Sequence, residues 1–92
     1  MTGAFSEILA PDAALTTNGL DLRGRDDCAR YLASVYAELR PYSVELESIN
    51  GEPGLTIRRG TAVVGVTILR MRHGLIEHVW LVTDAEKLRS WN

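Results

Sequence analysis

The chain has 92 residues, of which 46% are hydrophobic and 24% are charged, and its formal net charge is −2. This length and composition predict that residues 1–92 form one small globular domain, and they exclude a disordered or fibrous chain. The slight negative charge provides no basic field for a polyanion, so we expect no nucleic-acid partner.

Cysteine and histidine are too few for a disulfide or a typical metal site. Cys28 is the single cysteine, and only His73 and His78 accompany it. We therefore expect no metal and no cofactor, and a reducing cytoplasm fits best. No signal peptide is evident at the N-terminus, and nowhere do about 18 apolar residues run together, so we expect a cytoplasmic chain without a membrane partner.

The first residues predict a short helix followed by a strand. In residues 3–10 apolar side chains fall at helical spacing, and Pro11 then interrupts the pattern. Residues 12–17 are a short strand candidate. Residues 18–24 supply a turn that leads into a longer helix.

Residues 25–39 carry the pattern of an amphipathic helix. Its apolar face consists of Cys28, Leu32, Val35, Tyr36 and Leu39. Arg40 precedes Pro41, which disfavours a further helical turn, so we expect the helix to end there. We expect Tyr36 to be buried with its hydroxyl directed toward a cavity.

From residue 42 onward the sequence predicts four antiparallel strands joined by tight turns. The order is then helix, strand, helix and four strands. This order is typical of an α+β fold in which helices gather on one face of a curved sheet.

The last two strands form a hairpin if residues 73–74 are a two-residue turn, so that Arg72 pairs with Leu75. Counting back from this pair places Glu77 opposite Arg70. We interpret Glu77 as the partner in a cross-strand ion pair rather than as a catalytic group.

The same register predicts a mixed face that carries Gly65 and Thr67 on one strand and His78 and Trp80 on the next. The two small residues would leave space beside a large indole and a histidine that can donate or accept, as in many ligand sites. The alternative is a core in which Trp80 fills volume and His78 bonds a backbone carbonyl. For His78 taken alone, that alternative is favoured.

Both faces of the central strands are apolar, whereas one layer of helices covers only one of them. We therefore expect a second copy to cover the other face, in a homodimer formed through the sheet.

Residues 49–88 resemble the C-terminal SnoaL-like domain of extracytoplasmic-function sigma factors, a branch of the superfamily that includes nuclear transport factor two and ketosteroid isomerase. The matching residues are Asn50, Gly51, Pro53, Gly54, Leu55, Gly65, Gly74, Ile76, Lys87 and Leu88. The resemblance implies a bacterial protein with a cone-shaped, curved antiparallel sheet and helices on its concave face. It also implies that the first helix of the superfamily is missing here.

Departures from the family pattern restrict the expected functions. No sigma regions precede the domain in this sequence, so we expect no promoter binding. At the position that matches the general-base aspartate of ketosteroid isomerase, this sequence has Thr17. A hydroxyl alone cannot abstract a carbon-bound proton, so isomerase chemistry of that type is unsupported.

The leading interpretation is a module that binds a small apolar molecule in the cone or acts as a regulatory partner domain. The expected ligand-binding residues are Thr17, Leu32, Tyr36, Gly65, Thr67, His78 and Trp80. The main alternative is a small polyketide-cyclase-like enzyme, isomerase or hydrolase with His78 as its acid or base. The third is a purely structural dimerisation unit with a filled cone.

Overall fold

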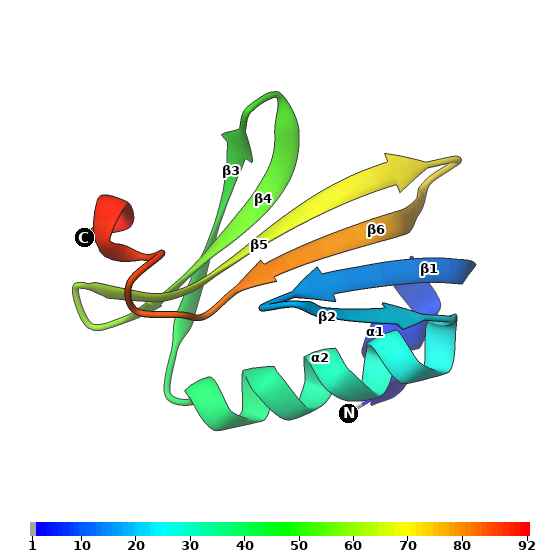
Figure 1. Ribbon diagram of the computed structural model, residues 1–92, viewed down its shortest axis with the longest axis horizontal. Coiled ribbons are helices and arrows are strands. Elements are labelled where there is room, and N and C mark those ends of the chain that lie inside the picture. Colours follow the sequence, from blue (N-terminus) through cyan, green and yellow to red (C-terminus); the bar gives the residue numbers. More distant parts are fainter. Residues whose placement is uncertain (1) are drawn as a thin grey trace.

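The computed structural model describes residues 2–92, which form two α-helices, six strands and a short 3-10 helix (Figure 1). In chain order these are α1 (Thr2–Ile8), β1 (Leu9–Thr17), β2 (Leu20–Arg23), α2 (Arg25–Leu39), β3 (Ser43–Ile49), β4 (Glu52–Arg59), β5 (Ala62–Arg72), β6 (Leu75–Val82) and η1 (Arg89–Trp91). None of the helices in this part of the chain is both long and apolar enough to span a bilayer.

The strands form one curved sheet in the order β2-β1-β6-β5-β4-β3. The predicted α+β class and the four consecutive antiparallel strands are confirmed. The sheet is mixed rather than fully antiparallel, because β1 lies parallel to β6. Since β1 separates β2 from β6, the first strand of the chain is covered on both edges.

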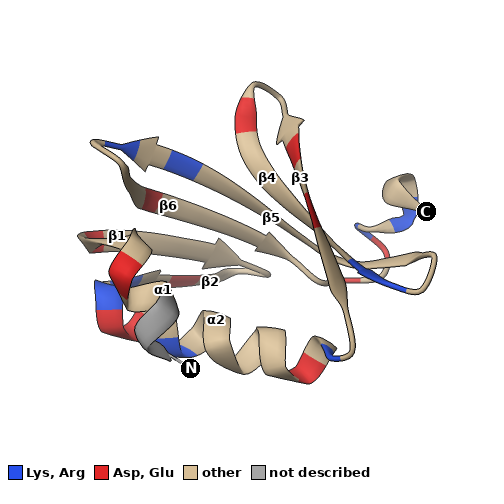
Figure 2. Cartoon of the chain, turned by 180° about the vertical axis from the view of Figure 1, so that it is seen from behind, with Lys and Arg blue, Asp and Glu red and all other residues tan. Residues whose placement is uncertain are grey.

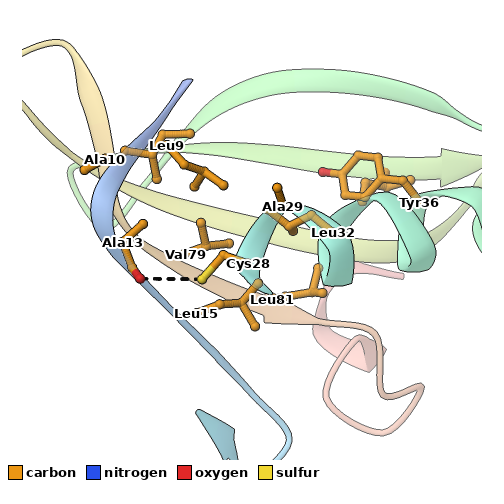
Figure 3. Packing of buried hydrophobic residues seen from close by; sticks show 12 residues of the cluster. Leu9, Ala10, Ala13, Leu15, Cys28, Ala29, Leu32, Tyr36, Val79 and Leu81 are labelled. Atoms are coloured by element: carbon orange, nitrogen blue, oxygen red, sulfur yellow. Dashed lines mark hydrogen bonds between the residues drawn. The ribbon is translucent and has the colours of Figure 1, made fainter. Parts of the chain in front are cut away.

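The two helices pack on the concave side of the sheet, which we call the inner face (Figure 1). Their apolar sides and the strands enclose the main core, part of which is shown in Figure 3: Leu9, Ala10, Ala13, Leu15, Cys28, Ala29, Leu32, Tyr36, Ile57, Ile76, Val79 and Leu81. Full burial of one leucine in such a core contributes about 1.5–3 kcal/mol relative to exposure. The predicted helical stripe is therefore the surface that holds α2 on the sheet.

Cys28 belongs to this core as a small buried side chain, as predicted. Its thiol donates a weak hydrogen bond to the carbonyl oxygen of Ala13, with Sγ 3.5 Å from the oxygen (Figure 3). Burial raises the pKa of the Cys28 thiol, and the nearby Asp27 carboxylate raises it further. The thiol thus stays protonated and is a poor nucleophile.

The opposite side of the sheet, the outer face, is partly covered by the C-terminal segment. Leu88 is buried there against Val63 and Val66, and Trp91 packs beside them. The Asn92 side chain accepts a hydrogen bond from the Val63 backbone N–H at 2.7 Å and donates one to its carbonyl oxygen at 3.1 Å. The chain itself thus covers part of the face that we expected a second copy to cover.

The N-terminal expectation needs one correction, because α1 ends at Ile8 and β1 already begins at Leu9. Pro11 lies inside β1, where the pairing with β6 is irregular between Leu9 and Ala14. A proline cannot donate to a sheet ladder, so it is tolerated at such an irregular position.

The segment expected as a turn between residues 18 and 24 contains a strand, β2. Asn18 and Gly19 both have positive φ and form a two-residue turn that pairs Thr17 with Leu20. Asn-Gly is a strong signal for such a hairpin, since both positions need a left-handed backbone. The short alternation of Leu20 and Leu22 with charged residues was the signal for the strand.

The register of the last hairpin is confirmed at its turn and wrong beyond it. Arg72 pairs with Leu75 as predicted, but Arg70 pairs with His78 because Glu77 is an extra residue in β6. This β-bulge lets Ile76 and Val79, three positions apart, both enter the core on the inner face.

Candidate functional site

A buried pair of hydroxyl groups lies on the inner face, between α2 and β5. The Tyr36 hydroxyl oxygen is 3.0 Å from the Thr67 hydroxyl oxygen, and either group can donate the hydrogen bond. Both side chains are almost fully buried. Helical spacing puts Tyr36 on the core side of α2, and strand alternation puts Thr67 on the inner face of β5.

Aromatic side chains from both ends of the helical layer surround Tyr36. The Phe5 ring of α1 lies 5.4 Å from the Tyr36 ring, and the Tyr42 ring lies 5.6 Å from it, both in edge-to-face contact. Such pairs are stabilising beyond the area that they bury. They fix the ring of Tyr36, so its hydroxyl points to one place on the sheet.

Burial raises the pKa of Tyr36, the hydrogen bond with Thr67 lowers it, and the neighbouring Tyr42 raises it. The net result is a pKa above the ordinary value of 10.0. Tyr36 is therefore a neutral hydroxyl near pH 7 that can donate or accept a hydrogen bond.

Beyond Tyr36, the inner face continues as an apolar surface that the helices leave open. Leu46 of β3 is 75% exposed, Met71 of β5 is 45% exposed and Val44 is 42% exposed. Leu55 and Leu69 are half-buried between these residues and Tyr36. We call these five residues the apolar rim.

The strand positions of the inner face near Tyr36 carry no histidine or carboxylate. By register and burial they are Val44, Leu46, Ser48, Leu55, Ile57, Gly65, Thr67, Leu69, Met71, Ile76, Val79 and Leu81. Hydroxyl groups are thus the polar functions of this surface. Within residues 2–92, no three side chains of the metal-binding types gather at one point.

The structure places His78 and Trp80 on the outer face, which corrects the prediction that they share a face with Gly65 and Thr67. The cause is the bulge at Glu77, because one extra residue turns all later side chains of β6 to the other side relative to β5. The expected hydrogen-bonding or catalytic histidine is therefore separated from Tyr36 by the sheet.

On the outer face, His78 stacks on Trp80 with ring centroids 4.0 Å apart and planes inclined by 9°. Arg70 lies over the same indole, with its guanidinium carbon 4.9 Å from the ring centroid. This arrangement is a cation–π contact next to an aromatic stack.

The hydrogen bonds of His78 define its tautomer. Thr16 Oγ1 lies 2.8 Å from His78 Nε2 and donates its own proton to the Asp21 carboxylate at 2.9 Å. Because the hydroxyl proton of Thr16 is used, Nε2 must carry a proton and donate to Thr16. His78 is therefore the donor in this hydrogen bond, whereas a histidine that activates a hydroxyl nucleophile must accept the hydroxyl proton.

Burial lowers the pKa of His78, and so do the positive charges of Arg70 and Arg23. The carboxylates of Asp21 and Glu77 oppose this effect with smaller contributions. The lowered pKa favours the neutral imidazole of His78 at pH 7.

Glu77 forms a different ion pair from the one predicted. Its carboxylate lies 3.3 Å from Arg72, whereas Arg70 pairs with Glu52 of β4 at 2.9 Å. The shift of register explains both exchanges, because Glu77 is no longer opposite Arg70. The interpretation of Glu77 as an ion-pair partner agrees with this geometry.

The other predicted site residues lie on the inner face but not all at one place. Leu32 is part of the packed core, and Gly65 lies under the end of α2, where an added Cβ would be 3.1 Å from Ile57 and 3.4 Å from Leu39. The space expected beside Gly65 is therefore filled. Thr17 lines a separate hollow of about 20 Å³ with Asn18, Leu81, Val82, Thr83, Asp84 and Lys87.

The prediction included Tyr36 and Thr67 but missed the residues around them. Phe5 packs on Tyr36 from a segment that is distant in sequence, and Tyr42 packs on it from just beyond the end of α2, outside the helical pattern. The apolar alternation of Val44 and Leu46 along β3 was the available signal for the rim.

Comparisons with known proteins reveal which fold this geometry belongs to. No protein-family model and no curated protein matches the sequence. Among solved structures, an NTF2-like protein of unknown function from Burkholderia xenovorans superposes with a TM-score of 0.67 at 17% identity, covering 87% of this chain and 67% of that one. The chain has the NTF2-like fold.

Two further structures agree with this fold and with the SnoaL-like resemblance. The extracytoplasmic function sigma factor SigJ of Mycobacterium tuberculosis superposes with a TM-score of 0.70 at 19% identity, covering 95% of this chain but 38% of the sigma factor. A protein of the SnoaL-like family from Agrobacterium tumefaciens gives 0.63 at 13% identity, covering 91% of this chain and 80% of that one. At these identities the likeness concerns the NTF2-like fold alone.

Proposed function

We propose that this chain is a binding module that holds a small apolar molecule with one polar group against the inner face. The observation that carries the proposal is the buried Tyr36 and Thr67 hydroxyl pair next to the exposed apolar rim. An apolar surface with a few fixed polar groups is the usual composition of a small-molecule site.

The hydroxyl pair suits a carbonyl or hydroxyl group on the ligand. One of the two hydroxyl hydrogens forms the bond between Tyr36 and Thr67, and the other is left for a ligand oxygen. Lone pairs on both oxygens can accept from a ligand hydroxyl. The apolar rim, which includes Leu46 and Met71, would shield the remaining surface of the ligand from water.

Acid or base catalysis in the cone has less support than binding. The inner strand positions carry no histidine or carboxylate, and Tyr36 keeps its proton near pH 7. His78, the one catalytic candidate, lies on the outer face and donates from Nε2 to Thr16. General acid–base catalysis needs a titrating group within hydrogen-bond reach of the reacting atom.

We also propose that a second copy of the chain covers the part of the outer face that the C-terminal segment leaves open. Trp80 and Ile68 face each other there in register, and both are half-buried. Covering this aromatic and aliphatic pair would remove apolar surface from water. A reducing cytoplasm stays the predicted location, because a chain with a single cysteine forms no intramolecular disulfide.

Binding is tested by nuclear magnetic resonance with 1-tetralone, a bicyclic ketone with one polar group, as the probe. The proposal predicts saturable changes in backbone amide signals around Tyr36, Thr67 and the apolar rim, and none around Trp80. Changes confined to the outer face, or no saturable change, would contradict it.

A further inference from the structure

The edge strand β3 has two charged residues, Glu45 and Glu47, but it lacks the other devices by which edge strands usually avoid new partners. β3 is the last strand of the sheet, and no strand in residues 2–92 pairs with its second edge. Its seven residues pair with β4 in an unbroken register, without bulge, proline or lysine. A regular and exposed edge of this length is a ready template for one more strand.

The opposite edge of the sheet is protected in the ordinary way. β2 has four residues, against seven in β3, and it carries both an acidic and a basic side chain. Short length and mixed charge disfavour addition of a strand. The sheet therefore has one closed edge and one open edge.

The two rows of side chains on β3 differ in chemistry. The inner row carries Val44 and Leu46, both exposed, and the outer row carries Glu45 and Glu47. Figure 2 shows these acidic positions on β3, seen from behind. An added strand would therefore meet an apolar row on one side and an acidic row on the other.

Only one of the two carboxylates has a cationic partner within residues 2–92. Glu45 pairs with Arg58 at 2.5 Å, whereas Glu47 accepts a hydrogen bond from Thr56 at 2.5 Å. Glu47 thus has an uncompensated charge next to the open edge. A lysine or arginine directly across from it would be favoured.

A second copy of β3 fits this edge poorly. Antiparallel pairing about Leu46 would place Glu45 opposite Glu47 of the second copy, twice in the same interface. Like charges directly across a strand pair are destabilising. The charge pattern therefore favours a different chain.

We propose that the open edge of β3 binds an extended segment of a partner protein as a seventh strand. The segment presents aliphatic side chains to Val44 and Leu46 and a lysine or arginine to Glu47. Backbone hydrogen bonds supply the attraction and the alternating side chains supply the selectivity, as in strand addition generally.

Shallow hollows lie at both ends of the β3 edge and suit the side chains at the two ends of such a segment. One, of about 380 Å³, is lined by Leu46, Glu47, Ser48, Gly51 and Pro53 at the β3–β4 turn. The other, of about 310 Å³, is lined by Pro41, Tyr42, Ser43, Arg58, Arg59 and Gly60 where β3 begins. The seven residues of β3 extend about 23 Å, which sets the length of the segment.

The test uses two blocked seven-residue peptides, one alternating lysine with valine and the other glutamate with valine, and follows the amide signals of the labelled protein at low salt. The lysine peptide should shift the amides of β3 and slow their hydrogen exchange. The glutamate peptide should bind at least about tenfold more weakly, because it faces Glu47 with a like charge.

Matched variants separate the edge from the rest of the surface. Leu46→Lys places a charge in the inner row of the open edge and should weaken binding of the lysine peptide about tenfold or more. Leu20→Lys, on the closed edge, should leave it unchanged. Thermal melts of both variants establish that the fold is retained.

Three results would overturn the proposal: no change in the β3 amides, equal affinity for the two peptides, or equal effects of Leu46→Lys and Leu20→Lys. Changes in the β3 amides with protein concentration, without peptide, would show that a second copy occupies the edge instead. None of these results depends on whether a small molecule binds on the inner face.

Discussion

The Tyr36 hydroxyl lies 3.0 Å from the Thr67 hydroxyl, and this bond joins helix α2 to strand β5 inside an apolar layer. The two residues are separated by 31 positions in the sequence. The bond fixes the position of the helix along the strand, and it places a pair of buried hydroxyl groups beside the open rim.

Tyr36→Phe should lower the free energy of unfolding by about 1–2 kcal/mol, because it leaves the buried Thr67 hydroxyl without its partner. Urea denaturation measures this loss. Tyr31→Phe is the control, since Tyr31 is half-buried and forms no side-chain hydrogen bond within residues 2–92. Equal losses for the two variants would show that the bond does not contribute.

The double variant Tyr36→Phe with Thr67→Val removes both hydroxyls and leaves none unpaired. It should be more stable than the sum of the two single changes predicts. Strict additivity would mean that the two side chains do not interact in solution.

His78 should titrate below its ordinary pKa of 6.5 in the folded chain, because burial and Arg70 disfavour its charged form. The unfolded chain then binds the proton more tightly. The free energy of unfolding should therefore decrease as the pH falls from 7 through the pKa of the unfolded chain and then through that of the folded chain. The Hε1 resonance of His78 reports the pKa directly. Arg70→Gln should move that pKa upward, whereas Arg89→Gln, in the C-terminal segment, should not.

Val66→Glu and Leu81→Arg should each destabilise the fold strongly, but in different layers. Val66 lies under Leu88 on the outer face, and Leu81 lies in the core on the inner face. Burial of an unpaired charge at either place is costly. Thermal unfolding of the two variants measures this, and Leu20→Glu, at an exposed position, is the control that should melt like the native chain.

Leu88→Ala should lower the free energy of unfolding by about 2–5 kcal/mol, as for other buried leucines. The C-terminal segment should then detach from Val63 and Val66, which hydrogen exchange at Val63 detects. A stable Leu88→Ala variant with unchanged exchange would show that the segment does not hold the outer face.

Most elements of the fold could be predicted from periodicity and turn residues. The apolar stripe from Cys28 to Leu39 indicated the long helix, and the turns that end in glycine indicated the strands from residue 42 onward. The short strand β2 was missed because an alternation over four residues is too short to distinguish a strand from a turn. The parallel pairing of β1 with β6 joins distant segments, so no local pattern indicates it.

The site was predicted only in part because one bulge changes which residues share a face. The aliphatic residues Ile76, Val79 and Leu81 are spaced by three and then two positions. The odd spacing is the signal for an extra residue, since a regular strand alternates by two. A register counted by strict two-residue alternation, without the extra residue, placed His78 and Trp80 on the wrong face of the sheet.

Association through the outer face should double the mass of the 10.2 kDa chain in sedimentation at micromolar concentration. Trp80→Arg should reduce it to the monomer, because a charge would replace the indole at the proposed contact. Val44→Arg, on the inner rim, should not. A native chain that remains monomeric at this concentration would contradict the proposal.

The most direct test of the binding account compares 1-tetralone with tetralin, which has the same rings without the carbonyl oxygen. The native chain should bind the ketone more tightly by about 1 kcal/mol, the contribution of one hydrogen bond. The double variant Tyr36→Phe with Thr67→Val, which removes both hydroxyls, should abolish that preference, whereas Thr56→Val, at a buried threonine of the outer face, should preserve it. Equal affinity of the native chain for the two compounds, or a preference that survives the double change, would contradict the account.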